Sequence, residues 1–128
     1  MSVVLDTTVL DTTVLVDVLR GDRAAVDFVM GLKRPPSCSE VSRVEIVRGL
    51  RSRERPAADR LFEELEWWPV DEVVARTAGE LGRTIRASHR SVGPMDLIVA
   101  ATAKLLERPL ATSNVKHYPM FPRLKPPY

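Results

Sequence analysis

Hydrophobic and polar residues alternate along this chain in a pattern that predicts strands followed by helices. Short stretches that are rich in Val, Leu and Thr, or that lie between helical segments, predict strands at residues 3–10, 36–39, 67–70 and 109–112. Segments whose apolar residues recur every three or four positions predict helices at residues 14–20, 22–33, 42–50, 56–65, 71–85 and 97–106. This alternation favours βα units, and therefore a parallel sheet with helices on both faces.

Several helix boundaries can be predicted from residues that cap helices. Gly21 is well placed to end the first helix, and Asp22 to cap the second one. Ser42, followed by Glu45 three residues later, has the spacing of a capping box, which predicts that a helix begins there. Residues 97–106 are apolar on almost every side, so we expect this helix to be covered from several directions.

The length of 128 residues fits one domain spanning residues 1–128. No GxGxxG or GxxxxGK[ST] loop is present, so nothing in the sequence supports a dinucleotide or P-loop site. In open α/β sheets, ligands bind at the carboxyl ends of the strands. The polar residues that follow each predicted strand are therefore the candidates for a functional site.

Three acidic residues stand where a predicted strand or loop leads into a helix, namely Asp11, Glu45 and Asp96. Each also has a structural explanation. Asp11 can cap a helix, Glu45 can complete the capping box, and Asp96 can complement a helix dipole. Position alone leaves Asp11 evenly balanced between a helix cap and a metal ligand. Together, however, the three acids can surround one cleft.

Such a cluster suits a hard divalent cation. Mg²⁺ and Mn²⁺ prefer oxygen ligands, and a cation held there can activate water and stabilise the leaving oxygen of a phosphodiester. The histidines His89 and His117 and the single Cys38 show neither zinc spacing nor the partners that a nucleophilic side chain needs. The residues therefore favour metal-dependent hydrolysis.

Composition adds little to this picture. Hydrophobic residues make up 45% and charged residues 28%, as in ordinary globular proteins, and the net charge of +2 barely favours nucleic acid. Arginine-rich stretches at residues 48–55 and 83–90 could follow a phosphate backbone or form solvated helix faces. No apolar run is long enough to span a membrane, the N-terminus lacks signal-peptide features, and one cysteine forms no internal disulfide. We therefore expect a cytoplasmic protein.

Four segments resemble, in order, the sequence blocks of PIN-domain ribonucleases, in particular the VapC toxins of type II toxin–antitoxin (VapBC) systems. They are residues 10–21 (LDTTVLVDVLRG), 39–50 (SEVSRVEIVRGL), 93–103 (GPMDLIVAATA) and 110–118 (LATSNVKHY). The first three blocks place the acids of the family on Asp11, Glu45 and Asp96. Because the blocks span almost the whole chain, their combination is far more specific than any one of them.

The resemblance implies a three-layer α/β/α sandwich around a short parallel sheet, and endonucleolytic cleavage of RNA with Mg²⁺ or Mn²⁺. It implies that Asp11, Glu45 and Asp96 are the catalytic metal ligands, with Thr12 as a polar neighbour. It also implies a homodimer and a cognate VapB-like antitoxin that blocks the site.

The fourth block departs from the family pattern. It often carries an acid at one of two positions, which are occupied here by Asn114 and His117. Asn114 can still offer a carbonyl oxygen or order a water on the metal, but it adds no charge. We therefore expect a single metal that is held less tightly. His117 is expected to be a structural or RNA-facing residue and not a ligand.

The first block is preceded by a copy of part of itself, because LDTTV occurs at residues 5–9 and again at residues 10–14. The apolar residues before Asp6 make the more strand-like approach to an acid. The spacing to Gly21, however, matches the family only from Asp11. We therefore favour Asp11 as the first metal ligand and keep Asp6 as the alternative.

Two other functions stay open. A receiver-like or phosphoryl-transfer domain also carries an acid at the end of its first strand, but Asp17 and Lys116 are not placed as its further partners. A PIN-like module that has lost catalysis and acts only by binding a partner is compatible with the missing fourth acid. If the chain does cleave RNA, Arg86 and Arg90 are the candidate RNA contacts.

Overall fold

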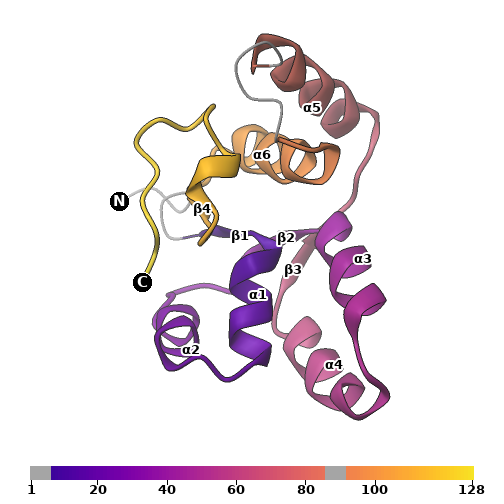
Figure 1. Ribbon diagram of the computed structural model, residues 1–128, viewed down its shortest axis with the longest axis vertical. Helices are drawn as coiled ribbons and strands as arrows, with labels where there is room; N and C mark the ends of the chain where they lie inside the picture. The colour runs from indigo at the N-terminus through magenta and orange to yellow at the C-terminus, as the bar shows by residue number, and fades with distance from the viewer. Residues whose placement is uncertain (1–6, 86–91) are drawn as a thin grey trace.

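A computed structural model describes residues 7–85 and 92–128, which show the predicted alternation of strands and helices (Figure 1). The strands form one parallel sheet in the order β3-β2-β1-β4, so β1 lies inside the sheet. They are β1 (Val9–Leu10), β2 (Ser37–Ser39), β3 (Glu66–Trp68) and β4 (Leu110–Ala111). The α-helices are α1 (Thr12–Leu19), α2 (Arg23–Met30), α3 (Glu40–Gly49), α4 (Arg55–Glu63), α5 (Glu72–Ile85) and α6 (Pro94–Leu106), and the 3₁₀ helices are η2 (Ser52–Glu54) and η3 (Val115–His117).

Helices cover both faces of the sheet, which confirms the three-layer α/β/α arrangement. In Figure 1, α5 and α6 lie on one side of the sheet, and α1, α2 and α4 lie on the other. Successive residues of a strand face opposite sides. Accordingly, Val9 and Leu110 pack in the cluster formed with α6, whereas Leu10 and Ala111 pack in the cluster formed with α1 and α4. Within the described ranges, no helix is both long and apolar enough to cross a membrane.

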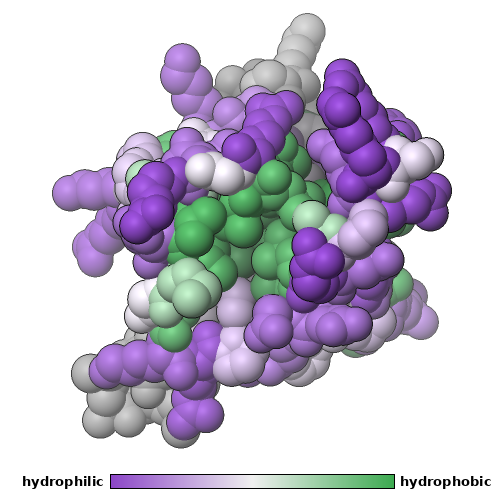
Figure 2. Space-filling view, turned by 90° about the horizontal axis from the view of Figure 1, so that it is seen from below, coloured by the Kyte–Doolittle hydropathy of each residue, from purple (hydrophilic) through white to green (hydrophobic). Residues whose placement is uncertain are grey.

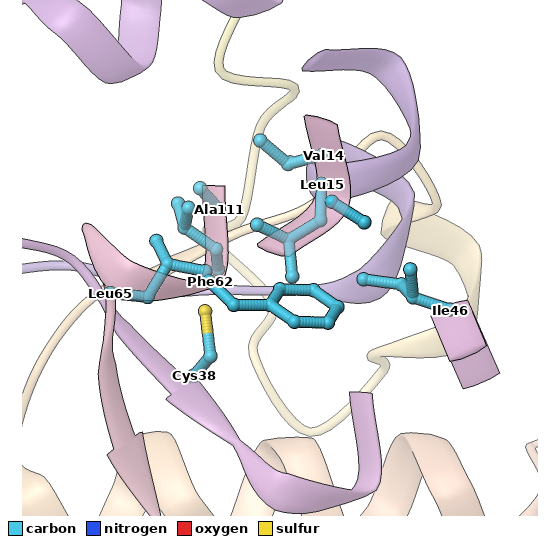
Figure 3. Packing of buried hydrophobic residues seen from close by; sticks show 9 residues of the cluster. Val14, Leu15, Cys38, Ile46, Phe62, Leu65 and Ala111 are labelled. Atoms are coloured by element: carbon cyan, nitrogen blue, oxygen red, sulfur yellow. The ribbon is translucent and has the colours of Figure 1, made fainter. Parts of the chain in front are cut away.

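The cluster on the α1 side fixes α1 against the sheet. In Figure 3 the ring of Phe62, from α4, lies among Leu15, Ile46 and Cys38, which come from three other elements. Leu15 is completely buried, and burial of such a side chain contributes about 1.5–3 kcal/mol to stability. This packing holds the junction between β1 and α1, where Asp11 lies, in one position.

The capping box predicted at Ser42 and Glu45 is wrong. α3 begins at Glu40, and its N-cap is Ser39, whose hydroxyl oxygen accepts a hydrogen bond from the Val41 N–H at 3.1 Å. Because Ser39 is also the last residue of β2, no loop separates the strand from the helix, and the helix begins earlier than predicted. Glu45 consequently lies in the middle of α3.

Other boundaries are closer to the prediction. Asp22 caps α2, and its carboxylate accepts a hydrogen bond from the Ala25 N–H at 3.1 Å. α6 begins at Pro94, which agrees with the prediction that Asp96 lies in its first turn, and it extends the apolar segment that was predicted from residue 97. Proline is well suited to the first turn of a helix. The strand predicted at residues 3–10 is observed only at Val9–Leu10, and residues 1–6 lie outside the described part of the chain.

Cys38 provides a test of the core. Its side chain is completely buried in β2, and burial raises the pKa of the thiol to about 12, well above that of a free thiol. We expect native protein at mildly alkaline pH to react with Ellman's reagent at least roughly a hundredfold more slowly than unfolded protein. In concentrated guanidinium chloride one thiol per chain should react. Rapid reaction of the native protein would contradict this packing.

Candidate metal centre

A pocket of about 490 Å³ opens at the edge of the sheet where the parallel strands lead into helices. Five predicted residues line it, namely Asp11, Thr12, Glu45, Asp96 and Asn114. They come from four separate parts of the chain: the β1–α1 junction, α3, α6 and the segment after β4. The fold therefore brings together all the described residues that the sequence predicted as the core of one site.

Asp11 is held by hydrogen bonds to both oxygens of its carboxylate. It is only 4% exposed. Its Oδ1 accepts a hydrogen bond from the Tyr118 hydroxyl at 2.9 Å, and its Oδ2 accepts from the hydroxyls of Thr112 at 2.7 Å and Thr13 at 3.1 Å. Asp11 occupies the N-cap position of α1, but its side chain makes no capping hydrogen bond. The carboxylate of Asp11 therefore does not cap α1.

Glu45 joins the site through Thr12. The Thr12 hydroxyl donates a hydrogen bond to Glu45 Oε1 at 2.6 Å and lies 2.9 Å from the hydroxyl of Ser42, which is completely buried. These contacts fix the inner side of α3 against the first turn of α1. Thr12, predicted as a polar neighbour of the metal site, thus contacts one of the predicted ligands directly.

Asp96 lies in the first turn of α6, as predicted, and contacts His117. Its Oδ2 lies 3.0 Å from the Nδ1 atom of that histidine. An ionised carboxylate can only accept, so the ring nitrogen donates this hydrogen bond. Burial raises the pKa of Asp96; the neighbouring His117 counteracts this rise, and the charge of Asp11 adds to it.

The pocket carries an excess of negative charge. Four of the residues that line it are acids, Asp11, Asp17, Glu45 and Asp96, and among its described lining residues Arg20 is the one arginine or lysine. Like charges that share a site of low dielectric constant repel one another, so this arrangement favours a bound cation.

The chemistry of these donors fits Mg²⁺ or Mn²⁺. Across residues 7–85 and 92–128, no three His, Cys, Asp or Glu side chains stand close enough to form a complete cage for one ion. Mg²⁺ does not require such a cage, because it keeps several waters and takes only one or two carboxylates from the protein. Carboxylate oxygens from Asp11, Glu45 and Asp96 around an open pocket are consistent with that preference.

The sequence did not predict the residues that hold Asp11. Tyr118 is 1% exposed, and burial, followed by the charges of Asp11 and Asp96, raises the pKa of its hydroxyl, which therefore stays protonated and donates. Thr112 is completely buried beside it. The available signal was position alone, since both residues lie in the block that follows the last strand, where the fold places ligand-binding groups.

The remaining predicted residues have different outcomes. Asn114 is exposed at the pocket, and its backbone N–H donates to the Thr112 hydroxyl oxygen at 2.9 Å. His117 has a structural contact, as expected, and that contact is with Asp96. Asp6, Arg86 and Arg90 lie outside the described residues, so their roles stay predictions.

Comparison with known proteins gives consistent matches over nearly the whole chain. Residues 8–119 match the family model described as PIN domain, and all four sequence blocks lie inside this range. Ribonuclease VapC19 of Mycobacterium tuberculosis is 41% identical over 122 residues, which cover 93% of this chain and 98% of the relative. Ribonuclease VapC10 of the same organism is 42% identical over 120 residues, which cover 92% of this chain and 90% of the relative.

Solved structures show the same fold. A toxin–antitoxin complex from Klebsiella pneumoniae contains a chain that superposes with a TM-score of 0.80 at 22% sequence identity. The superposition covers 94% of this chain and 98% of the other.

The hydrogen bond from Thr112 to Asp11 leads to a prediction about stability. Thr112→Val removes a donor from a buried carboxylate and leaves the Asn114 N–H without its acceptor. We expect the free energy of unfolding, measured by urea denaturation, to fall by about 1–3 kcal/mol. The control is Thr84→Val, because Thr84 is exposed and, among the described residues, its hydroxyl donates to carbonyls of α5. Its effect should stay within about 0.5 kcal/mol. Equal effects of the two changes would contradict the prediction.

Proposed function

Because this chain belongs to the PIN-domain family, we propose that it is an Mg²⁺- or Mn²⁺-dependent endoribonuclease that acts as the toxin of a type II toxin–antitoxin system. Two relatives that are more than 40% identical over nearly their whole length carry the name ribonuclease. The observation that carries the proposal is the position of Asp11, Glu45 and Asp96 around one pocket.

The residues of the pocket have separate tasks in this proposal. Asp11 and Asp96, supported by Glu45, hold the divalent cation, and Asn114 lies at the exposed rim, where it can orient a water. The bound cation supplies Lewis acidity, which makes water a nucleophile near neutral pH and stabilises the leaving oxygen of the phosphodiester. No covalent intermediate with a protein side chain is needed.

RNA is the substrate in this proposal, and the charges around the pocket are compatible with it. Arg20 lines the pocket and is exposed, so its guanidinium can approach a phosphate next to the one being cleaved. Arg86 and Arg90 remain the further candidate contacts. A cytoplasmic location is part of the same proposal, since the RNA and an antitoxin partner would be met there.

An antitoxin requires a surface to bind, and a groove between α1, α2 and α4 provides one. The groove has a volume of about 620 Å³, and its apolar lining includes Val18, Val29, Met30 and Leu61. Met30 is 79% exposed. Figure 2 views the molecule from this end and shows hydrophobic side chains gathered in a hollow with hydrophilic side chains around it. An amphipathic helix of a partner fits such a groove by burying its apolar face there.

We also infer a homodimer. Val44 and Val47 are 56% and 44% exposed, and they lie three residues apart on one side of α3. A second copy of the chain would cover such an apolar patch by packing against it around a twofold axis.

The proposed activity is tested by RNA cleavage with purified protein that is free of any partner. We expect cleavage with Mg²⁺ or Mn²⁺ and none with EDTA. Asp11→Asn, Glu45→Gln and Asp96→Asn should each lower the rate by at least roughly a hundredfold, because each removes a charge that holds the cation.

Asp6→Asn is the matched control, since it changes the same residue in the other copy of the LDTTV motif. It should cleave RNA at the normal rate. Loss of activity in this variant, with activity retained in Asp11→Asn, would make Asp6 the first ligand. Absence of metal-dependent cleavage in the normal protein would favour a PIN-like module that acts only through a partner.

The groove makes a separate prediction. The proposal predicts a small open reading frame directly upstream of the gene, and when the two are co-expressed the product of that frame should co-purify with this chain. Val29→Glu places a charge in the apolar groove and should weaken that association by at least about tenfold, because an unpaired charge is costly to bury. Val73→Glu, on the exposed side of α5, is the control and should bind normally. Equal binding by both variants would place the partner elsewhere.

A further inference from the structure

Two neighbouring residues at the end of η3 each contact one of the acids of the pocket. The His117 ring lies 3.0 Å from Asp96 Oδ2, and the Tyr118 hydroxyl lies 2.9 Å from Asp11 Oδ1. We propose that His117 and Tyr118 are positioning residues that together set where the two carboxylates stand for the metal. This inference rests on the proposed function and extends it to two residues without a direct role in holding the cation.

Tyr118 is held rigidly enough to act in this way. Its side chain is 1% exposed, its backbone N–H donates to the Val115 carbonyl at 3.0 Å, and its ring stacks on Phe121 with 6.5 Å between the ring centres. The hydroxyl therefore has one position, and it fixes the orientation of the Asp11 carboxylate. Thr112 and Thr13 both donate to Oδ2, whereas Tyr118 is the one of these three donors that reaches Oδ1. Oδ1 therefore keeps a lone pair for the pocket.

His117 performs the matching task for Asp96 at the more open side of the pocket. Its backbone N–H donates to the Asn114 carbonyl at 3.0 Å, which closes the turn of η3, and its side chain is 37% exposed. The Nδ1–H donates to Oδ2 of Asp96, so the ring orients this carboxylate as Tyr118 orients that of Asp11.

The two acids need such support because their backbones are independent. Asp11 lies between β1 and α1, whereas Asp96 lies in the first turn of α6 on the other side of the sheet. Two carboxylates near one another repel, so they do not maintain a useful separation by themselves. His117 is the last residue of η3 and Tyr118 follows it directly, so their backbones have a fixed spacing, and their side chains transmit that spacing to the two acids.

This arrangement gives the fourth sequence block a task. The block carries Asn114 and His117 at the two positions where an acid was expected from the resemblance. The block therefore supplies hydrogen-bond donors to the site, the His117 ring and the Tyr118 hydroxyl, instead of a further negative charge. Donors that orient a metal ligand commonly change metal affinity by about 10–100-fold when they are removed.

The test measures Mn²⁺ binding by the loss of the electron paramagnetic resonance signal of free Mn²⁺, which requires no RNA and no activity. Tyr118→Phe removes only the hydroxyl, and His117→Phe keeps a ring but removes the nitrogen. Each should weaken Mn²⁺ binding by roughly tenfold or more. His117→Asn restores an N–H close to the position of Nδ1 and should recover most of the affinity.

Tyr128→Phe is the matched control, because the Tyr128 hydroxyl also donates to a carboxylate, that of Asp17, but not to a proposed ligand. Its Mn²⁺ affinity should be normal. Thermal unfolding without metal identifies any variant that is merely unfolded, and only folded fractions are compared.

A double-mutant cycle separates positioning from a general structural effect. If Tyr118 acts through Asp11, then Tyr118→Phe should cause no further loss of Mn²⁺ affinity in a protein that already carries Asp11→Asn. Equal losses in both backgrounds would overturn the positioning role. Normal affinity in Tyr118→Phe and His117→Phe, with affinity weakened in Asp11→Asn, would overturn this inference alone. Absence of any Asp11-dependent Mn²⁺ binding would overturn the proposed function as well.

Discussion

A carboxylate as deeply buried as that of Asp11 loses much of its hydration free energy, roughly several kcal/mol, and donors in the protein must replace the lost water. One donor, Thr13, is a neighbour in the sequence. The other two, Thr112 and Tyr118, lie 101 and 107 residues further along the chain. Thr112 and Tyr118 follow β4 in the chain, so the pairing of β4 with β1 brings them to Asp11, and the site is complete only once this pairing has formed.

The metal in the proposed function also resolves a conflict of charge. The pocket is acidic and RNA is a polyanion, so the two repel each other as they stand. A divalent cation held by Asp11 and Asp96 would offset this repulsion at the place where the proposed cleavage occurs. Arg20 at the pocket contributes a positive charge on the protein side. The overall charge of +2 gives no hint of this local division.

Much of the fold and part of the site could be predicted from the sequence because local patterns determine them. The strand and helix order follows from apolar spacing, and the rule for the carboxyl ends of strands directed attention to Asp11 and Asp96. The start of α3 was mispredicted because Ser39 and Ser42 are equally good caps locally, and strand pairing through Ser39 decides between them. Tyr118 was missed because no local pattern shows that its hydroxyl meets a residue near the other end of the chain.

The position of β1 inside the sheet has a consequence for synthesis on the ribosome. β1 is made before its pairing partner β4, and the Asp11 donor Tyr118 follows Asp11 by 107 residues, so these long-range contacts form late. At translation rates of about 5–20 residues per second, the nascent chain spends several seconds in which Asp11 has been made but its donor Tyr118 has not. In the proposed function, a nascent chain that has not yet reached Tyr118 lacks the assembled site, and so it would not cleave the message from which it is being translated.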